Sequence, residues 1–359
     1  MIIKRKWRVF VMIVLICVVM AVFFIMKLTN NPRALTEQFV RNHMFNPSGT
    51  IASYLQDAPS TDPNVVAGRE ALSESLGLWL EYGIVMKDQK LFSDTTEQLR
   101  SKFMSPQGHI YWKLDKDGVS HVTTNALGDD LRIVRALLQA YELWGDEADL
   151  QLAKKINTYL MDKTRLEGYL VDFYDEANHY YSPTLSLVYV DVGAFKLMKK
   201  HQLMNSDDYD KYIAILEHMP IDTLFYPKLY EIESGKYTYD EKVNLIDQLI
   251  VALHLGEAGI DNKSLLQFLQ EQYAQNHKIY GAYHRDTLQP SVEYESPAVY
   301  ALAILLALQQ NDTEWAEKWN KRMLYFQTQH GKYAGGYVFD NNTHAFDNLF
   351  PLLAEAQLK

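Results

Sequence analysis

Residues 125–144 read NALGDDLRIVRALLQAYELW, and their apolar positions recur at helical spacing. A helix with so wide an apolar face is mostly buried. Asp129 and Asp130 stand where this helix begins. They are either helix-start residues that bond free backbone N–H groups or part of a functional site. Two neighbouring apolar stripes carry the pattern: Leu127, Leu131, Val134, Leu138 and Tyr141, then Ile133, Leu137, Ala140 and Trp144.

The composition indicates a large globular unit. The chain has 359 residues, of which 48% are hydrophobic, so a substantial core can form. Aromatic residues reach 13%, with 24 Tyr, a residue that suits wet clefts because one end is apolar and the other hydrogen-bonds. The net charge of -10 argues against nucleic acid as a partner. Cys17 is the single cysteine, which excludes an internal disulfide and a cysteine-based metal site.

The N-terminus has the pattern of a membrane anchor. Basic residues between Lys4 and Arg8 precede an uncharged apolar run at 9–26, near the minimum length for a transmembrane helix. We expect residues 1–8 to be a cytoplasmic tail and 27–359 to be one extracytoplasmic domain of a single-pass protein in the cell membrane. The alternative is a cleaved signal peptide. The run is longer than the apolar part of most signal peptides, and no small-residue cleavage site follows it.

The remaining chain is predicted to be all-α, with about a dozen helices in successive pairs and almost no strand. One short extended segment is expected at 109–114. No fixed-period repeat is visible, which argues against common solenoids. A closed ring of helical hairpins fits this pattern better. The predicted helices are 33–44, 68–87, 89–103, 125–144, 146–161, one ending near 200, 206–218, 240–255, 261–275, 292–309, 313–328 and 343–357.

Two further carboxylates draw attention by their surroundings. Glu74 lies among small residues, with Gly77 one turn on. Gly costs a helix roughly 1 kcal/mol against Ala, so it requires a reason, either room for a ligand or close helix packing. Asp240 follows a Tyr-rich stretch and, taken alone, reads as a helix cap. Glu74 and Asp240 lie near Trp79 and Tyr239, and carboxylates beside aromatic rings are what a sugar-cleaving cleft needs.

Other catalytic signatures are absent from the sequence. The eleven His show no HExxH or comparable ligand spacing, so we predict no catalytic metal. There is no phosphate-binding Gly loop and no GxSxG elbow. We therefore expect no cofactor.

Three separated blocks, spanning about residues 65–255, resemble family 8 glycoside hydrolases. Residues 73–77, SESLG, are similar to the family's SEGQG block, whose Glu is the general acid. Residues 126–134, ALGDDLRIV, are similar to its Asp-rich signature, and residues 108–113 to the segment before it. Tyr239-Asp240 resembles a Tyr-Asp-Ala block whose Asp is the general base. The chain departs from the family at Gly128, where the first signature Asp is expected, and at Val243, where the family has Arg and Lys242 is the neighbouring cation.

This resemblance implies an (α/α)6 barrel that hydrolyses glycosidic bonds with inversion of the anomeric configuration. Glu74 would be the general acid and Asp240 the general base, with their carboxyl groups roughly 6.5–9.5 Å apart. The expected substrate is a β-linked bacterial polysaccharide, by analogy with membrane-linked members that accompany polysaccharide synthases, so a synthase complex is a possible partner. The substrate-binding residues implied or proposed are Asp129, Asp130, Trp79, Trp112, Tyr181 and Tyr239.

Two other functions remain open from the sequence. One is a non-catalytic, membrane-tethered glycan-binding protein that assists a polysaccharide synthase, which the departures at Gly128 and Val243 favour slightly. The other keeps the barrel but changes the chemistry, because helical barrels also host sugar epimerases and lyases.

Overall fold

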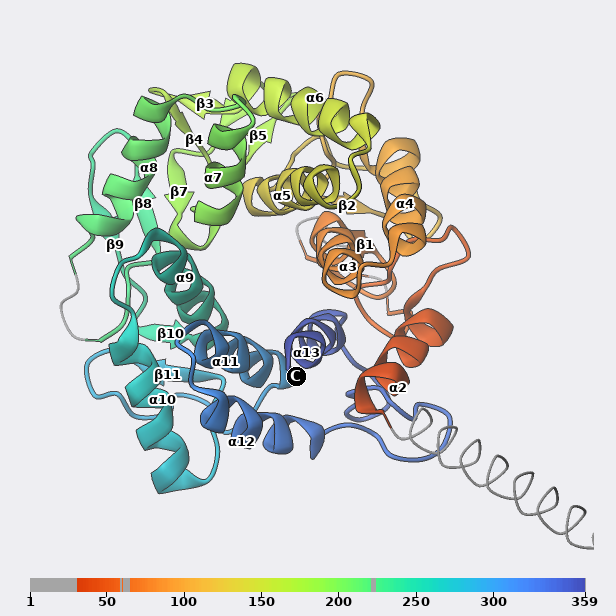
Figure 1. Ribbon diagram of the computed structural model, residues 1–359, viewed down its shortest axis with the longest axis vertical. Helices are drawn as coiled ribbons and strands as arrows, with labels where there is room; N and C mark the ends of the chain where they lie inside the picture. The colour runs from red at the N-terminus through yellow and green to blue at the C-terminus, as the bar shows by residue number, and fades with distance from the viewer. Residues whose placement is uncertain (1–30, 59, 61–64, 221–223, 359) are drawn as a thin grey trace, which may run out of the picture.

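Six inner helices surround a central axis, and six outer helices cover them (Figure 1). The computed structural model describes residues 31–358 except 59, 61–64 and 221–223. The predicted tail at 1–8 and anchor at 9–26 lie outside the described residues. Among the helices that are described, none has the length and apolarity needed to cross a membrane. The inner helices are α3 (Ser73–Met86), α5 (Leu127–Trp144), α7 (Val192–Lys200), α9 (Leu245–Ala258), α11 (Pro297–Gln309) and α13 (Phe346–Gln357).

The outer helices alternate with the inner ones along the chain. Each inner helix packs against the next, and α13 packs back against α3, so the ring closes. This arrangement confirms the predicted closed ring of helical hairpins. The outer helices are α2 (Pro32–Phe39), α4 (Gln89–Gln98), α6 (Glu147–Lys163), α8 (Ser206–Glu217), α10 (Lys263–Asn276) and α12 (Thr313–Leu324).

Local sequence signals explain where most outer helices start. Asp88, Asp146, Asn205 and Asp312 each cap a helix by accepting a bond from a backbone N–H in its first turn. Inner helices α5 and α9 are followed by glycines in the left-handed conformation, which end them at a sharp turn. Asp191 and Asn244 cap the inner helices α7 and α9 in the same way, and burial stabilises the inner helices further, since α11 is buried on almost every side.

The prediction of almost no strand was wrong in detail. Within the described residues, short strands of two or three residues occur in the loops that lead into inner helices. Because those loops run extended, α3, α9, α11 and α13 begin three to five residues later than predicted. The strands are β1 (Ala71–Leu72), β2 (Lys113–Leu114), β3 (Arg165–Leu166), β4 (Tyr169–Leu170), β5 (Tyr174–Asp175), β6 (Tyr180–Tyr181), β7 (Thr184–Ser186), β8 (Leu229–Glu231), β9 (Tyr237–Thr238), β10 (Lys242–Asn244) and β11 (Ala282–His284).

The two ends of the barrel therefore differ. At the C-terminal ends of the inner helices, turns of two to five residues lead to the outer helices. At their N-terminal ends, long loops carry the strands, including the antiparallel pairs β1–β2 and β10–β11. Two π-helical turns, η1 (Val40–Met44) and η2 (Leu99–Phe103), and a 3-10 turn, η3 (Leu187–Tyr189), complete the fold. Long loops on a rigid scaffold are where binding residues concentrate, which directs attention to the N-terminal end.

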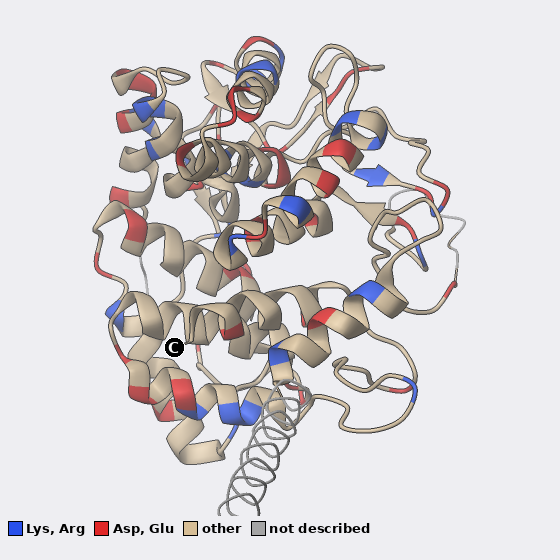
Figure 2. Ribbon diagram, turned by 45° about the vertical axis from the view of Figure 1, so that its right-hand side comes forward, with Lys and Arg blue, Asp and Glu red and all other residues tan. Residues whose placement is uncertain are grey.

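Charged residues are mixed over the molecule. Figure 2 shows acidic and basic residues interspersed along the helices in that view. This distribution accompanies the net charge of -10 and offers no broad cationic face in that view.

One buried acid far from the loops makes stability depend on pH. Both carboxylate oxygens of Glu355 in α13 are buried and lack a hydrogen-bond partner among the described residues. Burial raises the pKa of Glu355 from 4.5 to about 8, against the opposing effect of Arg33. The folded state thus holds this proton more tightly, so the group's contribution to stability is fully present below pH 4.5 and is lost as pH rises to about 8.

We expect Glu355→Gln to be more stable than the wild type at pH 9, by on the order of 2–4 kcal/mol, and nearly equal to it at pH 4. Gln resembles the protonated acid and does not ionise. Melting temperatures of both proteins across this range measure the effect. The exposed Glu97→Gln is the control, and a pH-independent difference between Glu355→Gln and wild type would contradict the assignment.

Candidate active site

Glu74 lies in the first turn of α3, at the loop-bearing end of the barrel. Its neighbour Ser73 donates a backbone hydrogen bond to the carbonyl of Trp112 at 3.0 Å. The Ser73 hydroxyl also donates to Oδ2 of Asp129 at 2.6 Å, which ties α3 to the start of α5. Glu74 and Asp129 are therefore brought together, as the sequence motifs implied, and Glu74 keeps a small exposed surface.

The electrostatics of this pair favour a protonated Glu74. Burial, followed by the negative charge of Asp129, raises the pKa of Glu74 to about 8, and Arg132 acts in the opposite direction. Burial also raises the pKa of Asp129, while the bond from Ser73 lowers it. Glu74 accepts or donates no side-chain hydrogen bond within the described part of the chain. A carboxylic acid that keeps its proton at neutral pH is suited to protonate a leaving group.

Gly77 is explained by close helix packing. A Cβ at this position would lie 2.9 Å from Cδ of Arg132, whose side chain crosses from α5 over α3. Of the two reasons considered for this glycine, the structure supports packing. The Arg132 guanidinium that Gly77 admits faces Glu74 and Asp129 on one side and Glu81 on the other.

Tyr189 is a site residue that the sequence did not reveal. Its ring packs on Gly128, where an added Cβ would lie 2.2 Å from Cδ1 of the ring. The carboxyl groups of Asp129, Asp172 and Glu74 all face the Tyr189 hydroxyl closely enough to raise its pKa, after burial as the main cause. The departure at Gly128 thus makes room for a phenol ring beside the candidate acid.

Asp130 is enclosed and does not face a cleft. It is 1% exposed, its Oδ2 accepts a bond from Asn125 Nδ2 at 2.6 Å, and burial raises its pKa well above the ordinary value. Asn125 in turn accepts the backbone N–H of Tyr174 at 2.7 Å. The placement of Asp130 therefore does not support a direct contact with a sugar hydroxyl, because a glycan cannot reach it; it positions the loop around Asn125 instead.

Asp240 lies in the loop before β10 rather than at a helix start, because α9 begins at Leu245 with Asn244 as its cap. Its carboxylate pairs with Lys228 Nζ at 2.9 Å, and the side chain is 36% exposed. A small pocket of about 40 Å³ separates Asp240 from Val188, Asp247 and their neighbours. Asp240 is thus an accessible carboxylate on a loop, which suits contact with water and ligand.

Two cations take the place of the arginine that the family motif expects at Val243. Val243 is 1% exposed and pairs with Tyr283 in the β10–β11 hairpin. Lys242, the substitute considered from the sequence, is exposed, and among the described residues it is Lys228 that forms the ion pair with Asp240. Arg285 Nε additionally donates to the Asp240 backbone carbonyl at 2.9 Å. Neither contact had a local sequence signal, because both partners come from other loops.

The segment around η3 connects the two acid clusters. Ser186 and Val188 line the pocket of Asp240, and Tyr189 contacts the cluster of Glu74. Asp172 accepts the backbone N–H of Ser186 at 2.5 Å, which fixes this segment. Both carboxylates therefore lie at the loop-bearing end of the barrel, on two sides of the same short segment.

The predicted aromatic residues divide into two groups. Trp112 is half-buried, and its backbone contacts Ser73, next to Glu74. Tyr181 is half-buried and its ring packs 4.7 Å from that of Tyr174, while Tyr239 is 36% exposed and lies under Arg285. Trp79 is different: it is 3% exposed and stacks on Tyr82. Because it is five residues after Glu74 in a helix, Trp79 points to another side and is not available to a glycan.

A wider hollow continues from the pocket of Asp240. Asn244 lines both this pocket and an adjoining hollow of about 500 Å³ at the N-terminal ends of α9, α11 and α13. Tyr294 is 60% exposed and Phe339 is 45% exposed along the hollow. These rings were not predicted as platforms; the ring of Tyr294 packs on Gly281, and its exposed part lines the hollow.

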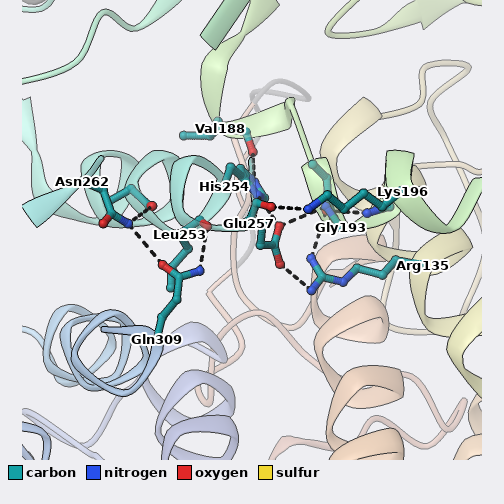
Figure 3. Close-up of polar contacts among 12 residues, drawn as sticks. Arg135, Val188, Gly193, Lys196, Leu253, His254, Glu257, Asn262 and Gln309 are labelled. Atoms are coloured by element: carbon teal, nitrogen blue, oxygen red, sulfur yellow. Dashed lines mark hydrogen bonds and ion pairs between the residues drawn. The ribbon is translucent and has the colours of Figure 1, made fainter. Parts of the chain in front are cut away.

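One cluster in the described residues has metal-binding residue types. Side-chain atoms of Asp191, His254 and Glu257 lie within 4.8 Å of one another. Arg135 donates to Glu257 at 2.6 Å and to Asp191 at 3.0 Å, so its guanidinium already supplies the positive charge that these carboxylates need (Figure 3). We assign no cofactor role to this cluster.

The contact between Gly128 and Tyr189 leads to a testable result. Gly→Ala in a helix interior normally stabilises by about 1 kcal/mol. We expect Gly128→Ala to destabilise by about 1–3 kcal/mol instead, because the new methyl group displaces the ring. Chemical denaturation measures this change. In a Tyr189→Ala background, Gly128→Ala should raise the free energy of unfolding, as it does in an ordinary helix. An equal loss of stability in both backgrounds would refute the contact between Gly128 and Tyr189.

Comparison with known proteins agrees with this geometry. No family model matches the chain. The chain is 36% identical to the putative lipoprotein YdaJ of Bacillus subtilis (strain 168) over 331 residues, which cover 91% of this chain and 88% of that protein.

Solved structures show the same architecture. An α-amylase from Clostridium perfringens matches with a TM-score of 0.82 and 25% identity over 91% of this chain and 98% of that one. PssZ from Listeria monocytogenes matches with a TM-score of 0.73 and 25% identity over 89% and 94%. Endoglucanase Cel10 of Klebsiella pneumoniae, a family 8 glycosyl hydrolase, matches with a TM-score of 0.63 and 15% identity over 90% and 98%. The chain belongs to the same family as YdaJ, and its fold is that of the family 8 glycoside hydrolases.

Proposed function

We propose that this protein is an inverting glycoside hydrolase that cleaves a bacterial polysaccharide, with Glu74 as general acid and Asp240 as general base. The acid protonates the glycosidic oxygen as the bond breaks. The base takes a proton from a water molecule that attacks the anomeric carbon from the opposite face. Asp129 and Tyr189 lie beside the acid and would contact the sugar at the cleavage point.

The observation that carries this proposal is the placement of Glu74 beside Asp129 at the loop-bearing end of the barrel, where Ser73 bonds to Asp129 at 2.6 Å; burial and Asp129 raise the pKa of Glu74 to about 8. A general acid must hold its proton at the working pH and still release it during reaction. Asp240 meets the opposite requirement, because it is an exposed carboxylate paired with Lys228 at 2.9 Å. Two acids with such different surroundings are the usual sign of an acid and base assignment.

A polymer is the favoured substrate because the hollow that adjoins the pocket of Asp240 has a volume of about 500 Å³, large enough for more than one sugar. Its exposed rings, Tyr294 and Phe339, offer apolar faces to pyranose rings. We propose a β-linked exopolysaccharide as the substrate. The fold alone does not distinguish an α-linked from a β-linked substrate, since proteins of this fold include both an α-amylase and an endoglucanase.

We further propose that the protein acts outside the cell, held to the membrane by residues 9–26, next to a polysaccharide synthase. The basic residues before the apolar run support this orientation. The word lipoprotein in the name of YdaJ also supports export. Surface proteolysis of intact cells tests the location.

The decisive experiment incubates the protein with β-linked and α-linked bacterial polysaccharides and measures new reducing ends. Proton NMR of the first product then gives its anomeric configuration. A β-linked substrate that yields an α product supports inversion. Binding without new reducing ends would instead favour the glycan-binding function, and an unsaturated or epimerised product would favour the lyase or epimerase alternatives.

The pH dependence of activity should report the state of Glu74. We expect kcat/KM to fall above pH 8, by about tenfold per pH unit, as Glu74 loses its proton. In Asp129→Asn this alkaline limb should move to lower pH, because the negative charge that helps raise the pKa of Glu74 is gone. Initial rates across pH measure the alkaline limb of the wild type and of Asp129→Asn. An alkaline limb at the same pH in both proteins would contradict the electrostatic interaction between Asp129 and Glu74.

A further inference from the structure

A second cavity runs along the interior of the barrel, from Gly128 and Val188 near the loop-bearing end toward the C-terminal ends of the inner helices. Its volume is about 570 Å³, within the range of small-molecule sites. Most of its lining comes from the C-terminal halves of α3, α9, α11 and α13, and it ends near Gln357, which is exposed. Nothing in the proposed hydrolysis uses this space.

The cavity has one polar and one apolar wall. The polar wall consists of charged residues from α3, α5, α9 and the segment before α7. The apolar wall is almost entirely aliphatic, with Phe350 as its single aromatic ring. The aliphatic residues that line the cavity are Ile84, Val85, Val188, Ile250, Leu253, Leu302, Leu305, Leu308 and Leu353.

Most charges of the polar wall already have partners (Figure 3). Arg135 bonds to both Glu257 and Asp191, and the Gly193 backbone N–H donates to Glu257 at 3.0 Å. His254 Nε2 lies 3.2 Å from the Val188 carbonyl. This part of the wall is a closed network and offers no free group to a ligand.

Two groups on the same wall lack partners among the described residues. Arg132 Nη1 is buried and donates no hydrogen bond. Glu81 accepts none there, and it faces Arg132 closely enough for the two charges to interact. The buried Arg132 donor without a partner is costly, and the half-buried Glu81 carboxylate beside it can still accept a hydrogen bond, so this pair is where a ligand would gain the most.

We propose that this cavity binds an uncharged amphiphile, with a hydroxyl head between Arg132 and Glu81 and an alkyl chain along α11 and α13. A hydroxyl group can accept from the guanidinium and donate to the carboxylate at once. The alkyl part of the ligand replaces water on the aliphatic wall, and the free energy gained is proportional to the apolar area that it covers.

The structure argues against the other ligand classes. A charged head would have to leave water for a wall where Arg132 and Arg135 already face the carboxylates of Glu81, Asp191 and Glu257, and that desolvation is costly. A sugar ring would find one aromatic residue, Phe350, against nine aliphatic ones, whereas sugar sites use aromatic platforms.

Isothermal titration of the full-length chain in lipid nanodiscs tests this assignment, with 1-octanol as the probe. Octanoate, octylamine and glucose are titrated in parallel, and empty nanodiscs give the blank. Leu305→Trp fills the cavity from α11, and Leu353→Trp repeats the change from α13. Leu143→Trp, at a site that is 40% exposed, is the matched control. Circular dichroism verifies that each variant is folded.

We expect saturable octanol binding in the wild type and Leu143→Trp, and at least about tenfold weaker binding in a folded cavity-filled variant. Octanoate, octylamine and glucose should bind more weakly than octanol. Equal octanol uptake by all variants would overturn the proposal, as would tighter binding of either charged probe or of the sugar.

Discussion

Glu74→Gln is expected to lower kcat on a polysaccharide by roughly 10²–10⁴-fold while leaving glycan binding nearly unchanged. Gln has the size of the acid and its hydrogen-bonding groups but cannot release a proton to the leaving oxygen. The site makes this substitution mild in other respects, because the burial that raises the pKa of Glu74 to about 8 already keeps the side chain neutral. Reducing-end assays and binding titrations with the same glycan separate the two effects.

Glu355→Gln is the matched control for this variant. Glu355 is also a buried acid on an inner helix, and its pKa is likewise raised to about 8, but it lies near the opposite end of the barrel. Turnover of Glu355→Gln should equal that of the wild type at neutral pH. If both variants lost activity equally, the loss would come from the fold, and Glu74 would have no role as an acid.

The nature of the leaving group provides an independent check. Dinitrophenolate leaves a dinitrophenyl glycoside without needing a proton. Glu74→Gln should therefore retain much more activity on such a glycoside than on the natural polymer. A purely structural defect would lower both activities by the same factor. This difference identifies a general acid without requiring a structure of the variant.

The sequence predicted the architecture well and the inner helix starts poorly. Helical spacing and caps such as Asp88 and Asp312 act within a few residues, so they are visible in the chain. The starts of α3 and α9 depend on the strands β1 and β10, which pair with strands far away in sequence. Long-range pairing kept those residues extended although their local pattern continued the helix.

The same distinction explains which site residues were found. Glu74, Asp129 and Asp240 belong to local motifs, so the chain alone suggested them as candidates. Tyr189 and Lys228 come from separate loops, and only the ring closure of the fold brings them to the acids. Asp130 belongs to the same motif as Asp129, and Trp79 follows Glu74 in the same helix, but a helix turns its side chains to different sides, and both residues are buried.

Asp240→Asn should cause the second large loss, roughly 10²–10⁴-fold in kcat, because Asn cannot take a proton from the attacking water. The loss should persist at every pH, unlike the alkaline loss caused by ionisation of Glu74. Lys228 pairs with Asp240 at 2.9 Å, and the amide of Asn still accepts a bond from it, so the loop should keep its position. Steady-state kinetics across pH, with melting temperatures for folding, measure this outcome.

Azide distinguishes a missing base from a damaged site, because it attacks the sugar without a general base. It should restore turnover to Asp240→Asn by forming a glycosyl azide of inverted configuration, and it should not restore Glu74→Gln on a polysaccharide. Asp57→Asn is the control, since Asp57 forms a similarly exposed ion pair with Lys116 at 3.0 Å. Near-normal turnover of Asp240→Asn without azide would remove this residue from the reaction and assign the base to another carboxylate, for which Asp247, in the same pocket, is a candidate.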